Sequence, residues 1–174
     1  MSSSTPVTKT ELLRLLGDMG IETKTHDHPA VFTVDESHRI KDTIPGGHTK
    51  NLFLKDKKGA RFLVVALNDT NIDLKTLHKK IGCGRLSFGN AGLLLQLLGV
   101  TPGSVTPFSL INDTRNEVGL ILDQKMMSLN LLNYHPLENT ATTSIKRDDL
   151  LAFFQKTGHN PLTLELADTD VPME

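Results

Sequence analysis

The single cysteine of this sequence is the first candidate for nucleophilic chemistry. Cys83 lies between two glycines, and three basic residues stand close to it in the chain: Lys79, Lys80 and Arg85. Nearby positive charge lowers the pKa of a thiol, but no partner histidine can be identified. A lone cysteine is more often a small buried side chain. We therefore expect Cys83 to fill space in a turn.

The histidines raise the question of a metal site. His26 and His28 would share one face of a strand, and others are available: His48, His78, His135 and His159. No HExxH or comparable ligand spacing occurs, and an HxH pair is weak by itself. One cysteine also excludes a zinc site within the chain that needs two thiolates. We expect hydrogen-bonded or surface histidines, with no metal and no cofactor.

Two polar clusters fall where loops meet predicted strands. Lys50 starts a strand directly after the chain-breaking sequence Pro45-Gly46-Gly47-His48. His135-Pro136, with Asn139 four residues after the histidine, lies in a loop between two strands. Rigid strand ends often carry binding and catalytic groups, but charged residues also commonly flank strands. Spacing alone leaves both interpretations open.

Charge is unevenly distributed, although the formal net charge is only -1. No acidic residue occurs between Asp73 and Asp113. Four basic residues fall in this interval: Lys75, Lys79, Lys80 and Arg85. The near-zero total excludes histone-like binding of polyanions, so any basic site must be local. The interval is either a surface for phosphate groups or the solvated face of a helix.

Capping residues and apolar spacing predict the elements that position these residues. Helices are expected at 8–20, 33–41, 73–82, 90–99 and 144–158, with Ser144 as the cap of the last one. Strands are expected at 21–25, 49–56, 60–67, 108–111, 117–122, 131–134, 141–143 and 162–166, with hairpin turns at 56–59 and 112–116. Residues 101–107, with two prolines and a glycine, predict a shaped loop. Hairpins mixed with helices, without regular βα alternation, indicate an α+β or mixed α/β fold.

Length and composition indicate one globular domain. The chain has 174 residues, of which 38% are hydrophobic and 22% charged. No apolar run approaches the ~20 residues of a membrane span, and no secretory signal precedes the first helix, so a cytoplasmic protein is expected. We expect a disordered N-terminus at 1–7, the domain at 8–168 and a tail at 169–174.

Four segments occur in a recognisable order. They are HPAVFTVDES at 28–37, GGHTKNLFLKD at 46–56, GRLSFGNAGLLLQLLGVTPGSVTPFSLIND at 84–113 and NYHPLENTATT at 133–143. Together they resemble the YbaK/prolyl-tRNA-synthetase-associated domain family, most closely its freestanding ProX- or PrdX-type deacylases. The resemblance implies a YbaK-like single domain with a central, largely antiparallel mixed sheet flanked by helices. It also implies hydrolysis of mischarged tRNA.

The resemblance implies roles for individual residues. Lys50 looks like the family's essential lysine, Asn51 follows it in the strand motif, and His135 looks like the histidine of the later HP motif; these three are the expected catalytic residues. The GSVTP sequence matches the family's GxxxP loop, with Gly103, Ser104 and Pro107 expected to bind the aminoacyl group. Val31, Phe32 and Thr33 fall in the segment that helps to wall the pocket, which would close around a methyl-sized group and exclude proline.

An aminoacyl ester is already activated, so its hydrolysis needs mainly a placed water and a stabilised oxyanion. Lys50 could hold the terminal phosphate or polarise the ester carbonyl, and the residues do not decide between these roles. Ala-tRNA(Pro) is the expected substrate; Cys-tRNA(Pro) or another mischarged tRNA, and a noncatalytic module that binds tRNA ends, are alternatives. The tRNA would be held by Lys75, Lys79, Lys80 and Arg85. Prolyl-tRNA synthetase and an elongation factor are the candidate partners, and no membrane is involved.

Overall fold

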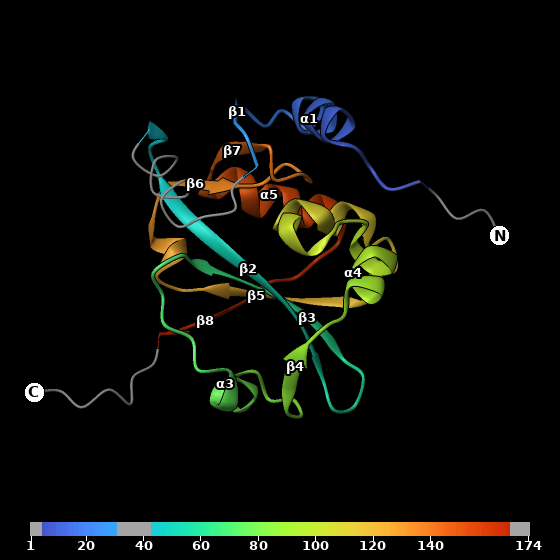
Figure 1. Ribbon diagram of the computed structural model, residues 1–174. Helices are drawn as coiled ribbons and strands as arrows, with labels where there is room; N and C mark the ends of the chain where they lie inside the picture. Colours follow the sequence, from blue (N-terminus) through green and yellow to red (C-terminus); the bar gives the residue numbers. More distant parts are fainter. Residues whose placement is uncertain (1–4, 31–42, 168–174) are drawn as a thin grey trace, which may run out of the picture.

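An eight-stranded mixed sheet forms the centre of the protein (Figure 1). The computed structural model describes residues 5–30 and 43–167. The strands are β1 (Thr23–Asp27), β2 (Gly47–Asp56), β3 (Arg61–Leu67), β4 (Leu86–Phe88), β5 (Val118–Asp123), β6 (Leu131–Tyr134), β7 (Ala141–Lys146) and β8 (Leu162–Leu164). Their order is β1-β7-β6-β2-β3-β5-β8, and β4 pairs with β2. The β2–β6, β3–β5 and β5–β8 pairs are parallel, and the others are antiparallel. The predicted α+β fold with a mixed sheet is confirmed.

The helices begin and end largely where capping residues predict. They are α1 (Lys9–Asp18), α3 (Leu74–Ile81), α4 (Ala91–Leu98) and α5 (Arg147–Thr157). The side chains of Thr8, Asp73 and Asn90 each accept a hydrogen bond from a backbone N–H in the first turn, as N-caps do. Gly82 and Gly99 end α3 and α4 in the left-handed conformation, at φ 85° and 69°, which glycine adopts without steric cost. Local sequence therefore sets these boundaries.

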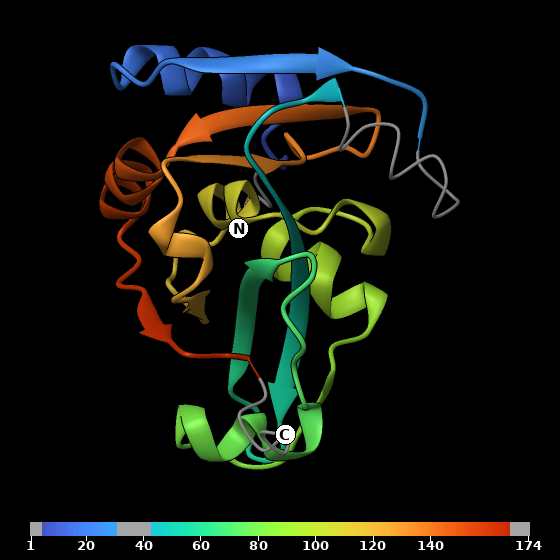
Figure 2. The same ribbon diagram turned by 90° about the vertical axis from the view of Figure 1, so that its left-hand side faces the viewer.

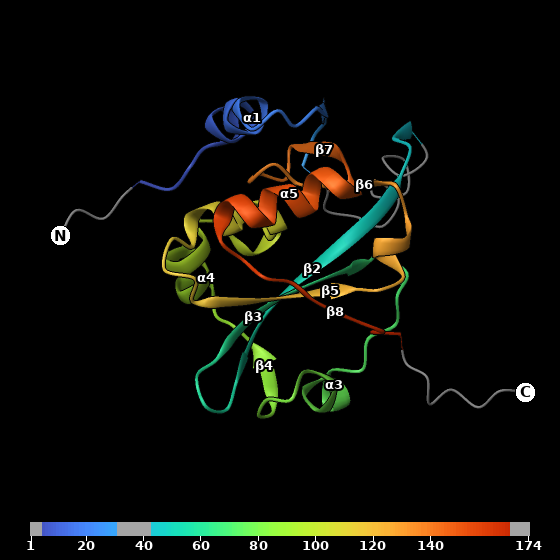
Figure 3. The same cartoon turned by 180° about the vertical axis from the view of Figure 1, so that it is seen from behind.

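Hydrophobic residues pack against both faces of the sheet. α1, α4 and α5, whose positions Figure 3 shows, bury leucines and phenylalanines in a larger cluster that includes Phe53 and Val65. α3 packs its buried Leu77 into a smaller cluster with Leu54, Val64 and Ala66. Seen from the side, α3 lies at one end of the molecule, and α1 and β1 lie at the other end (Figure 2). The long strand β2 runs between these ends and carries the candidate residues Lys50 and Asn51.

The predicted strand at 108–111 is wrong, and with it the second hairpin. Residues Pro107–Asn112 form a 3₁₀ helix, in which Thr106 accepts a hydrogen bond from the backbone N–H of Phe108. Phe108 is fully buried and makes edge-to-face contacts with Tyr134 and Phe153. Apolar content alone does not distinguish this buried turn from a strand. Strand β5 instead pairs with β3 and β8.

Two further expectations differ from the structure. Ser144 lies inside β7 and donates to the Asn133 side chain, so it does not cap α5, which has no side-chain cap. Strand β4 has only three residues and was not predicted. Its pairing with β2 places it at the sheet edge, which no local pattern reveals.

The ends of the chain are described in part. The backbone N–H of Val7 donates to Asn112 Oδ1 at 2.9 Å, and its side chain packs against the core, so Val7 is in contact with the domain, whose expected boundaries stay predictions. Residues 1–4 of the N-terminus that was expected to be disordered over 1–7, the expected helix at 33–41 and the expected tail at 169–174 lie outside the described residues. Within the described ranges, no helix is both long enough and apolar enough to cross a membrane.

Candidate functional site

Lys50 lies in the first half of β2 and is half-buried. It pairs with Ala66 of β3, and its ammonium Nζ donates to the carbonyl oxygen of Thr70 at 2.5 Å. Because successive strand residues point to opposite faces, Lys50 shares its face with His48 and Leu52. Leu52 packs in the cluster under α3, so Lys50 stands on the α3 face of the sheet.

Asn51 points to the opposite face. Its strand neighbour Phe53 and its pairing partner Val65 both belong to the larger core cluster. Asn51 Oδ1 is buried and, among the described residues, has no hydrogen-bond partner. The structure therefore does not bring the amide of Asn51 beside the amine of Lys50, because the two-residue period of a strand separates them.

His135 directly follows β6, and the register of β6 with β2 indicates on which side of the sheet it lies relative to Lys50. The parallel pairing of β2 with β6 sets His48 against Asn133, and Lys50 and His135 each lie two residues further along. Residues two apart in a strand share a face. Thr49 Oγ1 also donates to the carbonyl oxygen of Asn133 at 2.6 Å, which keeps the strands together beyond their last paired position. Continued by two residues beyond its last pair, this register predicts that the lysine and the histidine lie on one face.

The environment of His135 favours its neutral form. Burial lowers the pKa of His135, and the nearby His28 lowers it further, while a hydrogen bond to the carbonyl of Ala141 opposes these effects. That bond joins His135 Nδ1 to the Ala141 oxygen at 3.1 Å, so Nδ1 carries the proton and donates. Nε2 then holds the lone pair. The ring is an acceptor that could take a proton from water.

His28 was considered above as a metal ligand, and the structure makes it a residue of the candidate site. Its Nδ1 bonds the carbonyl oxygen of Pro29 at 2.9 Å, and its Nε2 lies 2.8 Å from Thr142 Oγ1. Thr142 is buried on β7. Because a carbonyl oxygen only accepts, His28 Nδ1 is the donor to Pro29. The HPAV segment that contains His28 was the signal for it in the sequence.

The GSVTP loop, residues 103–107, lies against the loop that begins with His135 and Pro136 and contains Asn139, here called the HP loop. A Cβ built on Gly103 would stand 3.4 Å from Asn139 Nδ2, which places the two loops in contact range. Gly103 is the exposed middle residue of a short 3₁₀ turn, Pro102–Ser104, while Ser104 and Pro107 are buried. The structure thus brings together the second polar cluster and the loop expected to bind substrate. Val31, Phe32 and Thr33 lie outside the described residues.

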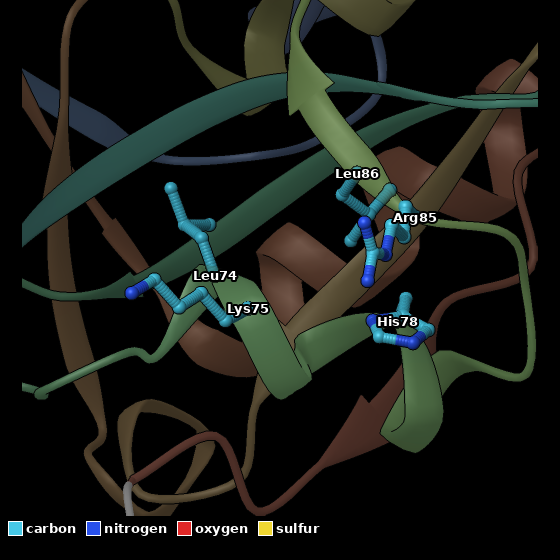
Figure 4. A pocket seen from close by; sticks show the side chains of 5 residues that line it. All are labelled: Leu74, Lys75, His78, Arg85 and Leu86. Carbon is cyan, nitrogen blue, oxygen red and sulfur yellow. The ribbon is translucent and has the colours of Figure 1, made fainter.

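The basic residues expected to bind tRNA lie on and after α3, and all are exposed or half-exposed: Lys75, Lys79, Lys80 and Arg85. A cavity of about 430 Å³ lies between α3 and β4, lined by Leu74, Lys75, His78, Arg85 and Leu86 (Figure 4). In this view Arg85 extends toward His78, whereas the Lys75 side chain points away from them. Lys80 donates to the carbonyl oxygens of Glu165 and Ala167, so it also holds the segment after β8.

An exposed aromatic side chain extends this surface. Phe88 of β4 is 58% exposed and pairs with Leu54 of β2, which faces α3. It therefore shares the face of Leu86 and the cavity. The exposure of this single ring could not be predicted from the sequence.

Asp56 fixes the loop that carries Arg85. Its carboxylate accepts hydrogen bonds from the backbone N–H groups of Lys58, Ala60 and Gly84. The bond from Gly84 is the largest cause that holds the Asp56 pKa below its usual value. In the same loop, burial and then the charge of Asp56 raise the pKa of Cys83. A thiol held protonated is a poor nucleophile.

Metal ligands do not gather in the described part of the chain. Among residues 5–30 and 43–167, no three His, Cys, Asp or Glu side chains are grouped as a metal site requires. The two histidines considered as a metal-binding pair have different surroundings. His28 bonds Thr142, whereas His26 lines a cavity beside α1. The expectation of metal-free chemistry stays a prediction.

Comparison with known proteins places this geometry in a family. Residues 28–153 match the model of the aminoacyl-tRNA editing domain. The chain is 37% identical to prolyl-tRNA synthetase associated domain-containing protein 1 of Mus musculus, covering 90% of this chain and 95% of that protein. It is 35% identical to the prolyl-tRNA editing protein ProX of Acetoanaerobium sticklandii, covering 91% and 97%.

A solved structure shares the fold. A crystal structure described as a candidate trans-editing enzyme for prolyl tRNA synthetase superposes with a TM-score of 0.65 at 20% identity, over 94% of this chain and 98% of the other. The family match covers well over half of the chain and includes the strand of Lys50, the GSVTP loop and the HP loop. The chain therefore belongs to the aminoacyl-tRNA editing domain family, a family of aminoacyl-tRNA deacylases.

Proposed function

We propose that this protein hydrolyses the ester bond of mischarged tRNA(Pro) in trans, with Ala-tRNA(Pro) as its main substrate. The observation that carries the proposal is the parallel pairing of β2 with β6, from which we infer that Lys50 and His135 share one face of the sheet; burial of His135, which lowers its pKa, favours the neutral ring. The prolyl-tRNA editing protein ProX is a relative over nearly the full length, which supports tRNA(Pro) as the RNA.

Lys50 and His135 have different roles in the proposed reaction. Lys50 supplies a positive charge that either stabilises the oxyanion formed at the ester carbonyl or holds the terminal phosphate. His135 Nε2 accepts a proton from the attacking water, a role that requires its neutral form. A ribose hydroxyl of the tRNA is an alternative proton acceptor. The exposed backbone of Gly103 is available to lie against the aminoacyl group.

Discrimination between alanine and proline would come from size. A synthetase site shaped for proline rejects the smaller alanine poorly, because a missing methylene is worth only about 1–3 kcal/mol. A second pocket that admits alanine can exclude the larger proline ring by steric conflict. We assign this wall to Val31, Phe32 and Thr33 from the family resemblance.

The direct test measures amino acid release from Ala-tRNA(Pro), Cys-tRNA(Pro) and Pro-tRNA(Pro). We expect release of alanine to be fastest and Pro-tRNA(Pro) to remain intact, because the pocket excludes the proline ring. Preference for cysteine would assign the protein to a different substrate. Equal rates for alanine and proline, or binding of all three without release, would contradict editing.

The basic residues are proposed to contact phosphates of the acceptor end. Replacing Lys75 and Arg85 together with Glu should raise KM more than it lowers kcat, because these side chains bind substrate far from the ester. The slope of log affinity against log salt should become shallower by about 0.7–0.9 for each phosphate that the variant no longer neutralises. The assay is deacylation kinetics at several salt concentrations.

A matched pair serves as control for that charge change. Arg115 and Lys156 are exposed on other elements, and their double replacement with Glu alters net charge equally. KM should respond less to this change. Lys80 is left unchanged, because it donates hydrogen bonds to Glu165 and Ala167. Its replacement would change the stability of the protein as well as its binding of RNA. Equal responses of both double variants would mean that only overall charge matters.

Deacylation should survive both chelation by EDTA and replacement of Cys83 with Ser. Water attack on an activated ester requires neither a metal nor a thiolate, and the Cys83 thiol is held protonated by its raised pKa. The measurement is the initial rate for Ala-tRNA(Pro) with each treatment. Loss of activity on chelation with recovery on adding zinc would support a metal site, and loss only in the Ser variant would restore Cys83 as nucleophile.

A further inference from the structure

The contact that holds the Lys50 ammonium is itself held by a buried polar network. Lys50 Nζ donates to the carbonyl oxygen of Thr70, and within the described residues no carboxylate lies at ion-pair distance from it. A neutral carbonyl restrains an ammonium without cancelling its charge. Since an ammonium has three donors, this contact leaves two for a substrate.

Asp123, the last residue of β5, holds Thr70 in place by a hydrogen bond. Thr70 Oγ1 donates to Asp123 Oδ2 at 2.7 Å, and the backbone N–H of Leu67 donates to the same oxygen at 3.1 Å. The other oxygen, Oδ1, accepts from the backbone N–H of Lys125 at 3.2 Å. Thr70 is 2% exposed and Asp123 is 1% exposed, so water does not compete for these bonds. One carboxylate thus binds the turn after β3 to the turn after β5.

The same turn is closed by its own backbone. The N–H of Thr70 donates to the carbonyl oxygen of Leu67 at 3.0 Å, and the N–H of Asn68 donates to the carbonyl oxygen of His48 on β2. These two backbone hydrogen bonds fix the position of the Thr70 carbonyl relative to β2. The Thr70 hydroxyl is the side-chain link between that carbonyl and the buried carboxylate.

We infer that Thr70 and Asp123 are positioning residues for Lys50 in the deacylation reaction. The inference rests on the proposed function, in which the Lys50 charge meets the ester or the terminal phosphate. Lysine is flexible, and catalysis by a point charge depends on where the charge stands. A displacement of about 1 Å at a reacting group can cost about 100-fold in rate. Asp123 acts through Thr70 and does not contact substrate.

The test compares Thr70→Val with Thr70→Ser. The Val variant lacks the hydroxyl that binds Asp123, and the Ser variant keeps it. We expect the Val variant to fall roughly tenfold or more in kcat with little change in KM, because substrate binding is retained while the charge is misplaced. Lys50 should also react faster with trinitrobenzenesulfonate in the Val variant, as followed by mass spectrometry. The Ser variant should retain near wild-type values.

Asp113→Asn is a matched control for loss of stability. Asp113 is also a buried carboxylate that accepts from backbone N–H groups, those of Glu117 and Val118, and its other partner is His159 rather than the Lys50 network. This variant should lower the melting temperature while leaving kcat per folded molecule unchanged. A similar fall in kcat for both Asp113→Asn and Thr70→Val would show a general effect of destabilisation and would overturn the inference.

Comparison with Lys50→Ala separates failure of the inference from failure of the proposed function. If Lys50→Ala is inactive and Thr70→Val has wild-type kcat and wild-type Lys50 reactivity, Thr70 does not position the lysine and only the inference fails. If Lys50→Ala is fully active, the lysine has no role in the reaction, and the proposed mechanism fails together with the inference.

Discussion

Replacing Lys50 with Ala should abolish deacylation of Ala-tRNA(Pro) while the protein stays folded. Removing one group that stabilises an oxyanion costs about 100- to 1,000-fold in rate, and removing a phosphate-binding group would weaken binding as well. The side chain is half-buried in a strand and, among the described residues, makes one hydrogen bond, to Thr70, so its removal leaves the hydrophobic clusters intact. Single-turnover rates and thermal melts of the purified variant measure the two effects.

Two companion variants make this result specific. Lys50→Arg should not restore the rate, because a planar guanidinium cannot place a compact charge at the same point. Lys55→Ala removes a lysine from the same strand, five residues along and on the opposite face, and should retain activity. A fall in kcat confined to Lys50 identifies an oxyanion role, whereas a rise in KM alone identifies a phosphate contact. Normal turnover by Lys50→Ala would remove the lysine from the mechanism.

Replacing His135 with Gln should lower kcat by about 100-fold or more, the usual contribution of a general base. It should also change the pH profile. Since burial lowers the pKa of His135 below its ordinary value of 6.5, the ring of the wild-type protein stays neutral at pH 7. It gains a proton only when the pH falls below that lowered pKa. The wild-type rate should therefore fall on the acid side with a midpoint below 6.5, and the Gln variant should lack this limb.

His26→Gln is the matched control for His135. His26 lies on β1 and lines a cavity beside α1, and the proposed reaction does not use it. Its replacement should leave the acid limb unchanged. The unfolded chain takes up the His135 proton at a higher pH than the folded protein, so the free energy of unfolding should fall as pH drops below 6.5. An acid limb that persists in His135→Gln would assign proton transfer to another group, such as the ribose hydroxyl.

Local sequence was a good guide wherever the stabilising contacts are local. The caps Thr8, Asp73 and Asn90 act within their own helices, and each was predicted from spacing of a few residues. The segment at 108–111 was predicted wrongly because Phe108 owes its conformation to contacts with Tyr134 and Phe153, far along the chain. Ser144 has the chemistry of a cap, but pairing of β7 with β6 uses it inside a strand.

The sequence by itself determined the chemical parts of the site: a lysine in a central strand, a histidine before a proline, a GSVTP loop and a basic interval without acids, although it predicted the lysine at a strand end and β2 begins three residues earlier, at Gly47. Tertiary structure decided which of these parts meet. The β2–β6 register, continued beyond its last pair, predicts that Lys50 and His135 share one face, and the pleat of β2 points Asn51 to the opposite face, where Phe53 and Val65 belong to the larger core cluster. Asp123 lies far along the chain from Lys50 and supports it only through strand pairing and a buried turn. Short-range patterns specify helices and turns because their hydrogen bonds close within a few residues, whereas the site depends on contacts between distant segments that only the packed sheet brings together.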